Sequence, residues 1–226
     1  MTVVDAKRPA QDLGNAILNL SQSKQILARE TTAWTLRAPW LEAGITLAKI
    51  AQEELGHAQL LANFHADHFA GGRKWTEPVG LKGEIDHPDV VPFAALTASW
   101  PEFIALMCFW DCAVATGLET LTGLGDLPIG NSISKMSKDE ERHRLFAQGS
   151  ARELLARGGQ VQEAFKQAAD VVVPKVGDWL DSFTDQEWLQ RAETGPKAAP
   201  RERYLDRVGP LLADLKLTWP EQRDAA

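Results

Sequence analysis

Apolar residues recur at three- and four-residue spacings along most of the chain, and short polar or glycine- and proline-containing stretches separate these runs. This period is typical of helices, because residues three or four apart lie on one helix face. Breakers end successive runs at Pro39, Gly71, Gly123 and Gly158. The pattern predicts helices over residues 12–32, 41–69, 90–118, 130–158, 161–183 and 203–217. No segment alternates as a strand does, so the predicted fold class is all-α.

The connections between the predicted helices are typical of a bundle. Residues 73–92 contain three prolines and form the longest irregular segment, which suits the crossover between two bundle halves. The segment 123–130 is short, so we expect the helices on either side of it to be antiparallel neighbours. We also expect a kink at Pro174 and an interruption of the last helix at Gly209 and Pro210.

Length and composition predict one domain. The 226 residues carry 24 Lys and Arg against 31 Asp and Glu, a net charge of −7. We expect a single helical domain over residues 1–226, with a bundle core at about 12–157 and a helical extension over 160–226. Its basic residues are scattered, and an acidic surface repels phosphate groups, so we expect neither nucleic-acid nor membrane binding.

The apolar segment 90–118 is long enough to cross a membrane, but it carries Pro101, Glu102 and Asp111 in its interior. We therefore interpret it as a buried core helix. The first fourteen residues lack the apolar core of a signal peptide, so we expect a cytoplasmic location. The two cysteines have neither zinc-site nor disulfide spacing, which fits a reducing compartment.

One motif occurs twice, as an acid followed by Glu-x-x-His. The copies are EELGH at 53–57 and DEERH at 139–143. Residues three apart share a helix face, so Glu54 with His57, and Glu140 with His143, can each chelate a metal ion. Such pairs on two helices, with a carboxylate from each of two others, form the ligand set of ferritin-like di-iron and di-manganese bundles. Exposed helix faces with incidental histidines are the alternative interpretation.

A carboxylate on the third predicted helix fits this ligand set. Asp111 is the best candidate because its neighbours are apolar, and a buried carboxylate needs a counter-charge. We assign structural or surface roles to Glu102 and Glu119. The acids that lead the two motifs, Glu53 and Asp139, are expected either to bond the outer nitrogens of the histidines or to face solvent.

The first predicted helix lacks a well-placed carboxylate. Its span contains only Asp12 at the start and Glu30 near the end, with Lys24 in the middle. Carboxylate-rich sites favour iron or manganese over zinc or copper. The sequence therefore predicts an iron-type site in which one ligand position is uncertain.

Four segments resemble the phenylacetic acid catabolic protein family: TLRAP at 35–39, LAKIAQEELGH at 47–57, FWD at 109–111 and DEERH at 139–143. The resemblance covers about residues 12–157 and implies a ferritin-like bundle. It implies one of two roles. A-type subunits of phenylacetyl-CoA epoxidase use a di-iron centre, dioxygen and a separate reductase to epoxidise the aromatic ring, whereas C-type subunits are structural partners that have lost metal ligands.

The resemblance also implies roles for particular residues. The metal ligands that it implies are Glu54, His57, Asp111, Glu140 and His143. Glu54 and Glu140 would bridge two ions. The sixth position falls on Lys24, whose ammonium cannot ligate a metal and would pair with Glu54 instead. Lys24, Glu53 and Asp139 are thus expected to surround or alter the site.

Three site states remain open: a single ion on Asp111, Glu140 and His143, a metal-free scaffold, or a dinuclear centre completed by another group. We expect a subunit of a phenylacetyl-CoA-type ring epoxidase or monooxygenase with an iron site. A C-type structural subunit, or an iron or manganese protein of other function, is the alternative. The expected partners are a reductase, an acyl-CoA substrate, and further copies of the chain or a homologous ferritin-like subunit.

Overall fold

The computed structural model describes residues 8–70, 85–93, 97–122, 129–184 and 200–217. Within these residues the chain is helical and contains no strand, which confirms the all-α prediction. The helices are α1 (Arg8–Thr35), α2 (Leu41–His68), α3 (Trp100–Leu106), α4 (Cys112–Thr122), α5 (Gly130–Arg157), α6 (Gly159–Thr184) and α8 (Pro200–Leu215). A short 3-10 helix, η1 (Val91–Phe93), precedes α3, and a π-helix, η2 (Met107–Asp111), joins α3 to α4.

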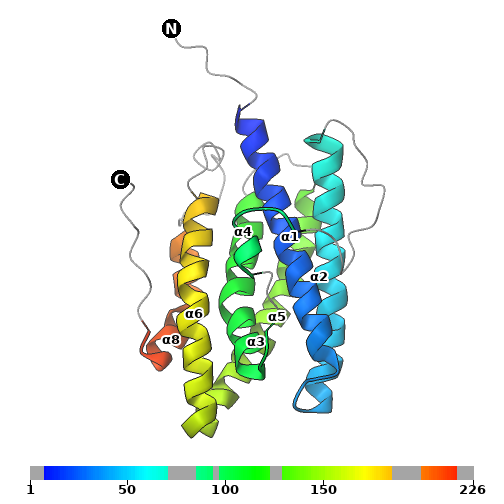
Figure 1. Ribbon diagram of the computed structural model, residues 1–226. Helices are drawn as coiled ribbons and strands as arrows, with labels where there is room; N and C mark the ends of the chain where they lie inside the picture. Colours follow the sequence, from blue (N-terminus) through cyan, green and yellow to red (C-terminus); the bar gives the residue numbers. More distant parts are fainter. Residues whose placement is uncertain (1–7, 71–84, 94–96, 123–128, 185–199, 218–226) are drawn as a thin grey trace.

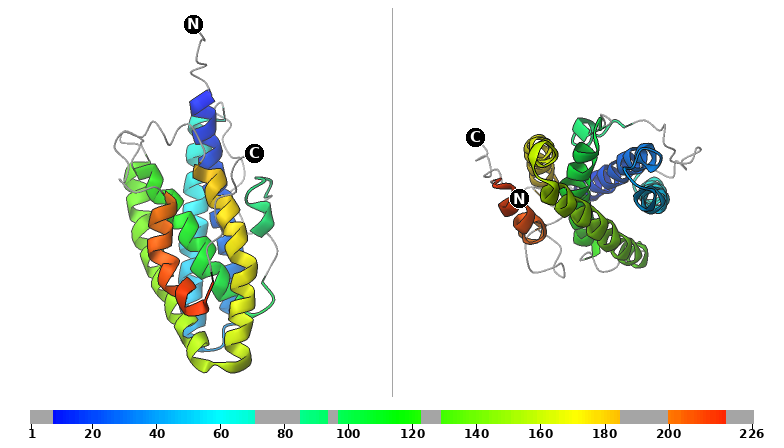
Figure 2. Two further views of the ribbon diagram at one scale, coloured as in Figure 1. Left: turned by 90° about the vertical axis from the view of Figure 1, so that its left-hand side faces the viewer. Right: turned by 90° about the horizontal axis from the view of Figure 1, so that it is seen from below.

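The helices form a ferritin-like bundle with two further helices on one side (Figure 1). The hairpin of α1 and α2 makes one half of the bundle. The continuous rod of α3, η2 and α4, together with α5, makes the other half. Outside this core, α6 packs against α3, η2 and α5, and α8 packs against α4 and α6. Figure 2 shows α8 lying beside α6 on the flank of the bundle away from the α1–α2 hairpin.

The third bundle helix begins later than the sequence pattern predicts. The predicted start at residue 90 is wrong, because the rod begins at Trp100. There the Ser99 hydroxyl accepts a hydrogen bond from the backbone N–H of Glu102, and Pro101 occupies the first turn, where its missing N–H has no cost. The span Trp100–Leu121 is long and apolar enough to cross a membrane, but 89% of its most apolar window is buried in the bundle. It is therefore a core helix.

The predicted break in the last helix is also wrong. Helix α8 continues through Gly209 and Pro210. Helix α6 contains Pro174 in its interior, and the kink expected there stays a prediction. A proline removes one hydrogen bond, but the apolar face of α8 is buried and holds the helix together. By contrast, the predicted end of α5 is confirmed: Gly158 and Gly159 follow it with positive φ angles of 63° and 55°, a conformation that glycine adopts readily.

Helix α1 is buried on most of its circumference, which is unusual for a helix with so many polar residues. It lies against α2 along its length and also contacts α4. Its buried polar residues include Asn19, Ser21, Gln22, Ser23, Lys24 and Gln25. Some bond to neighbouring elements; the Ser21 hydroxyl, for example, donates to the backbone carbonyl of Ala58 at 2.8 Å. This burial places Lys24 inside the bundle with no solvent exposure.

Candidate metal centre

The ammonium of Lys24 lies among three carboxylates at the centre of the bundle. Its Nζ is 3.1 Å from Oε1 of Glu54, 3.0 Å from Oδ1 of Asp111 and 2.6 Å from Oε2 of Glu140. These carboxylates come from α2, η2 and α5, so each of the other bundle helices supplies one. All four side chains are almost completely buried. An ammonium carries three N–H donors, and here each of them has a charged acceptor.

The π-helix helps to bring Asp111 to this point. It spans Met107–Asp111 in the middle of the rod, and Asp111 is its last residue. A π-turn inserts an extra residue per turn, which changes the direction of the side chains that follow, and such turns are frequent at functional sites. The neighbouring residues Phe109 and Trp110 are fully buried, so the carboxylate of Asp111 lies in an otherwise apolar segment.

The imidazole of His57, on α2, is held by the second motif. Its Nδ1 is 3.1 Å from Oε1 of Glu140, and its Nε2 is 3.2 Å from Oδ2 of Asp139. Both acids belong to α5, across the bundle from His57. The inner nitrogen therefore points to the central cluster, and the outer nitrogen bonds the acid that leads the second motif.

The imidazole of His143, on α5, is held in the reciprocal way by the first motif. Its Nδ1 is 2.8 Å from Oε1 of Glu54, and its Nε2 is 2.9 Å from Oε2 of Glu53. The two histidine rings lie 6.4 Å apart between their centroids. Each motif thus supplies two acids to the histidine of the other motif, and this crossed arrangement joins α2 to α5.

Arg142 closes the cluster on the solvent side. Its Nη2 lies 2.7 Å from Oε1 of Glu53 and 2.5 Å from Oδ1 of Asp139. The sequence reasoning assigned no role to Arg142, although it stands inside the second motif, one residue before His143. Because the two motifs cross, Arg142 faces the leading acid of each.

The charges of the cluster shift the pKa values of its members. Burial lowers the pKa of His143, but the hydrogen bond to Glu54 and the surrounding carboxylates outweigh it and raise the pKa to about 10. The pKa of Lys24 lies well above its ordinary value, because its three carboxylates outweigh the effect of burial. Burial opposes ionisation of Glu140, yet Lys24 holds its pKa below the ordinary value. For Asp111, burial prevails and raises the pKa.

The buried set Glu54, Asp111, Glu140 and His143 is of a kind that could hold a metal ion, since ligand atoms of these four residues lie within 4.8 Å of one another. However, the ammonium of Lys24 already bonds the three carboxylates of this set. Two divalent ions need that space and those oxygen atoms. With Lys24 in place, the residues present do not fit a dinuclear metal centre.

The charges also come close to balance without a metal. The cluster contains five carboxylates, and the cations facing them are Lys24, Arg142 and, when protonated, His57 and His143. Five negative charges against four positive charges leave a single net negative charge. A buried cluster this close to neutrality needs no further cation to be stable.

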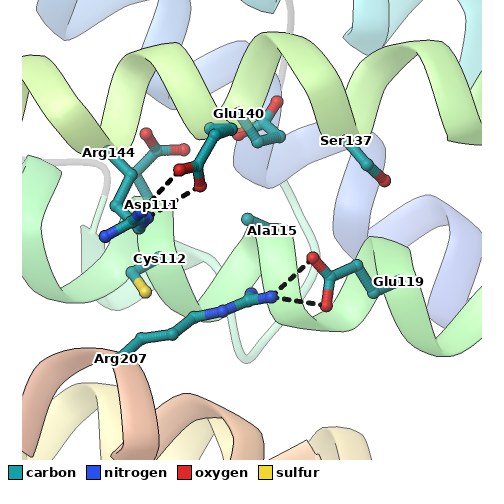
Figure 3. A pocket seen from close by; sticks show the side chains of 9 residues that line it. Asp111, Cys112, Ala115, Glu119, Ser137, Glu140, Arg144 and Arg207 are labelled. Atoms are coloured by element: carbon teal, nitrogen blue, oxygen red, sulfur yellow. Dashed lines mark hydrogen bonds and ion pairs between the residues drawn. The ribbon is translucent and has the colours of Figure 1, made fainter. Parts of the chain in front are cut away.

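A small polar pocket lies beside the central cluster, between α4, α5 and α8 (Figure 3). Asp111 and Glu140 form its inner wall. Farther out, Arg207 of α8 makes a two-pronged ion pair with Glu119 of α4, at 2.6 and 2.7 Å. The structural or surface role expected for Glu119 thus agrees with its position, and the pocket, of about 20 Å³, lies between the cluster and this ion pair.

The acids at the other end of the bundle lie outside the cluster. Glu30 is buried, and its Oε2 accepts hydrogen bonds from the backbone N–H and hydroxyl of Thr97, at 2.9 and 2.7 Å. Glu102 accepts a hydrogen bond from the backbone N–H of Ala98. The structure brings the five predicted ligands together with Lys24, and Glu30 lies apart from them. Metal binding by the five stays a prediction.

Comparison with protein families identifies a match for this chain. The profile of the family described as phenylacetic acid catabolic protein matches residues 3–226, almost the whole chain. A comparison with curated proteins finds no significant match. The family match extends beyond the segments on which the resemblance was based and includes α6 and α8.

Proposed function

Since the chain belongs to the phenylacetic acid catabolic protein family, we propose that it is a structural, metal-independent subunit of a multicomponent phenylacetyl-CoA-type ring epoxidase. The family acts in phenylacetate catabolism, through complexes of several components. Within such a complex, the chain would support a homologous catalytic subunit and perform no oxygen chemistry itself.

The observation that carries this proposal is the position of Lys24. Its ammonium bonds Glu54, Asp111 and Glu140, which are the carboxylates that an iron site would need. Removing these groups from each other is costly, because three buried carboxylates would lose their counter-ion. The side chains that would bind iron in a catalytic subunit instead stabilise the helix bundle.

The proposed partners follow from this role. A catalytic homologue would carry the metal, accept electrons from a reductase and bind the acyl-CoA substrate, and we expect all of these components in the cytoplasm. Association of a structural subunit with a homologous bundle is consistent with the prevalence of compact, symmetric oligomers.

The competing function is an iron-containing oxygenase component. It is favoured by the buried Glu, Asp and His set, whose ligand atoms lie within 4.8 Å of one another. In that function, two iron ions held by carboxylates and histidines would supply the activation of dioxygen. It requires Lys24 to leave its three carboxylates, so the two functions predict different metal contents.

The proposal is tested by purifying the wild-type chain from iron-supplied cells and measuring its iron content and its turnover of phenylacetyl-CoA with a reductase. We expect no stoichiometric iron and no turnover by the chain alone. Addition of an A-type catalytic chain should give a stable complex and turnover. Stoichiometric iron, or turnover by the chain alone, would show that it is a catalytic component.

A further inference from the structure

We infer that a groove between η1, α3 and α6 binds a small carboxylate with an apolar tail, and that Lys175 at its rim receives the carboxylate group. The groove has a volume of about 410 Å³, within the range of roughly 300–1,000 Å³ that is typical of small-molecule sites. None of its lining residues belongs to the central cluster around Lys24. The inference therefore goes beyond the proposed function and does not depend on it.

The groove lies on the flank of the bundle where the segment before α3 runs beside α6 (Figure 2). Two hydrogen bonds join the segment to this helix: the Nζ of Lys175 donates to the carbonyl of Pro92 at 3.3 Å, and the Ser182 hydroxyl donates to Asp89 at 2.7 Å. Most of the lining is apolar and comes from all three elements; it includes Phe93, Leu106, Ala168, Val171 and Val172. The groove thus has an apolar floor with polar groups at its edges.

Contacts within the protein hold the walls of the groove. Phe93 stacks on Trp110, with 4.1 Å between the ring centroids and 5° between the ring planes. Thr97, another lining residue, donates its N–H and hydroxyl to Glu30 and accepts a hydrogen bond from the indole N–H of Trp34 at 2.7 Å. Both side chains are fixed by neighbours outside the groove, so the site is preformed, as most small-molecule sites are.

The charges at the edges favour an anionic head group. Glu102 lines the groove, but its Oε2 accepts a hydrogen bond from the backbone N–H of Ala98 at 2.8 Å, and it lies in the first turn of α3, where the helix dipole compensates a carboxylate. Lys175 bonds the neutral carbonyl of Pro92, and among the described residues no carboxylate lies within 4.0 Å of its Nζ. An ammonium has three N–H donors, so two remain for a carboxylate ligand.

The apolar surface next to Lys175 favours a ligand with a tail. Ala164, Ala168 and Val171 lie three or four residues apart and therefore share one face of α6. Val171 is 59% exposed, so apolar surface beside the ammonium is in contact with water. From Ala164 to Lys175 this face is about 16 Å long, which accommodates an extended tail of several carbons. Burial of that tail and of Val171 supplies the apolar part of the binding free energy.

The test compares octanoate with octylammonium, which have the same tail and opposite charges, by isothermal titration calorimetry on the full chain. We expect one octanoate per chain, bound roughly tenfold more tightly than octylammonium, because one charge-assisted contact contributes about this factor. The net charge of −7 attracts the cation, so the overall field of the protein does not explain a preference for the anion. Lys175→Glu should reverse the preference.

The matched control is Lys166→Glu, which makes the same change of charge on the opposite side of α6, nine residues away, and should still prefer octanoate. Val171→Glu, at an exposed position that tolerates a polar side chain, should abolish octanoate binding without lowering the melting temperature. The inference is overturned if the wild type does not bind octanoate, if it binds octylammonium equally well, or if either groove variant binds octanoate as the wild type does. Binding of an A-type catalytic chain that Val171→Glu prevents, with no octanoate bound by the wild type, would also overturn it and would assign the groove to a protein interface.

Discussion

Helix α1 buries two ionisable side chains of opposite charge, Lys24 and Glu30, and the protein compensates them differently. Lys24 has three carboxylates around its ammonium. The hydrogen-bond donors of Glu30 are the neutral N–H and O–H groups of Thr97, Arg29 and Arg37 act on it through charge alone, and its Oε1 has no hydrogen-bond partner within the described part of the chain. The first group is therefore held in its charged form, whereas burial raises the pKa of Glu30 and favours its neutral form.

This comparison shows what a buried charge needs. Neutral donors compensate part of the hydration free energy that a charged group loses on burial, and opposite charges compensate more of it. Two buried groups six residues apart on one helix thus differ in their roles: Lys24 joins three other bundle segments, while Glu30 fixes the backbone just before α3. The predictions below test this difference.

The largest effect is expected for Lys24→Met, measured with a chelator present. The variant keeps much of the apolar volume but leaves three buried carboxylates without their cation, which should lower the free energy of unfolding by about 3–5 kcal/mol. Denaturant unfolding at neutral pH measures it. Lys49→Met is the control, because Lys49 is exposed and its ion pair with Glu53 is long, at 3.8 Å. Equal destabilisation by the two substitutions would contradict the central role of Lys24.

A smaller effect, dependent on pH, is expected at His143. Its pKa of about 10 in the folded chain exceeds the ordinary value of 6.5. The group therefore contributes its full stabilisation below pH 6.5 and loses it as the pH rises toward 10, by at most roughly 1.4 kcal/mol per pH unit. Unfolding free energies from pH 6 to 10 should fall more steeply for the wild type than for His143→Gln. Parallel curves would mean that His143 is neutral in the folded chain.

At Glu30 the pH dependence has the same direction as at His143, but the substitution is expected to stabilise the chain. Because its pKa is raised in the folded chain, the wild type loses stability as the pH rises above the ordinary value of about 4.5. Glu30→Gln keeps an acceptor for Thr97 without the charge, so it should gain roughly 1 kcal/mol or less relative to the wild type between pH 5 and 8. Glu30→Ala removes the acceptor for Thr97, so this variant should be less stable than the wild type at pH 5 and at pH 8. A loss of relative stability by Glu30→Gln at pH 8 would show that the carboxylate is needed in its charged form.

The smallest effect is expected for Arg142→Ala. Arg142 is half exposed and bonds Glu53 and Asp139 at the solvent edge of the cluster. Water and salt screen such contacts, so the melting temperature should change little, and any change should disappear at high salt. Thermal unfolding at low and high ionic strength measures this. A large, salt-independent decrease would place Arg142 among the groups that the buried cluster requires.

Much of the fold and of the candidate site followed from local sequence pattern. Helical periodicity predicted α2 and the end of α5 closely, because the period of a helix and its terminating glycines are properties of a few consecutive residues. The same local spacing showed that the Glu and His of each Glu-x-x-His pair lie on one face of a helix. The apolar surroundings of Asp111 identified it as a buried acid, and the structure places it in the central cluster.

One error arose where tertiary contacts outweighed local preference, and the other where a local capping residue outweighed the apolar pattern. Pro210 reads as a helix breaker, yet α8 continues through it because its apolar face packs against α4 and α6. The apolar run from residue 90 predicted a helix start that capping by Ser99 moved to Trp100. In both cases the hydrophobic pattern alone does not show which interaction decides the helix boundary.

The sequence by itself determined that the chain is an all-α bundle, which residues share helix faces, and that a lysine stands where a carboxylate was expected. Only the tertiary structure decided that each histidine bonds the acids of the other motif, and that Lys24 bonds three carboxylates and not Glu54 alone. The physical reason is distance along the chain. Residues 24, 54, 111 and 140 meet only after four helical segments pack, and no local preference specifies the order in which their charges pair.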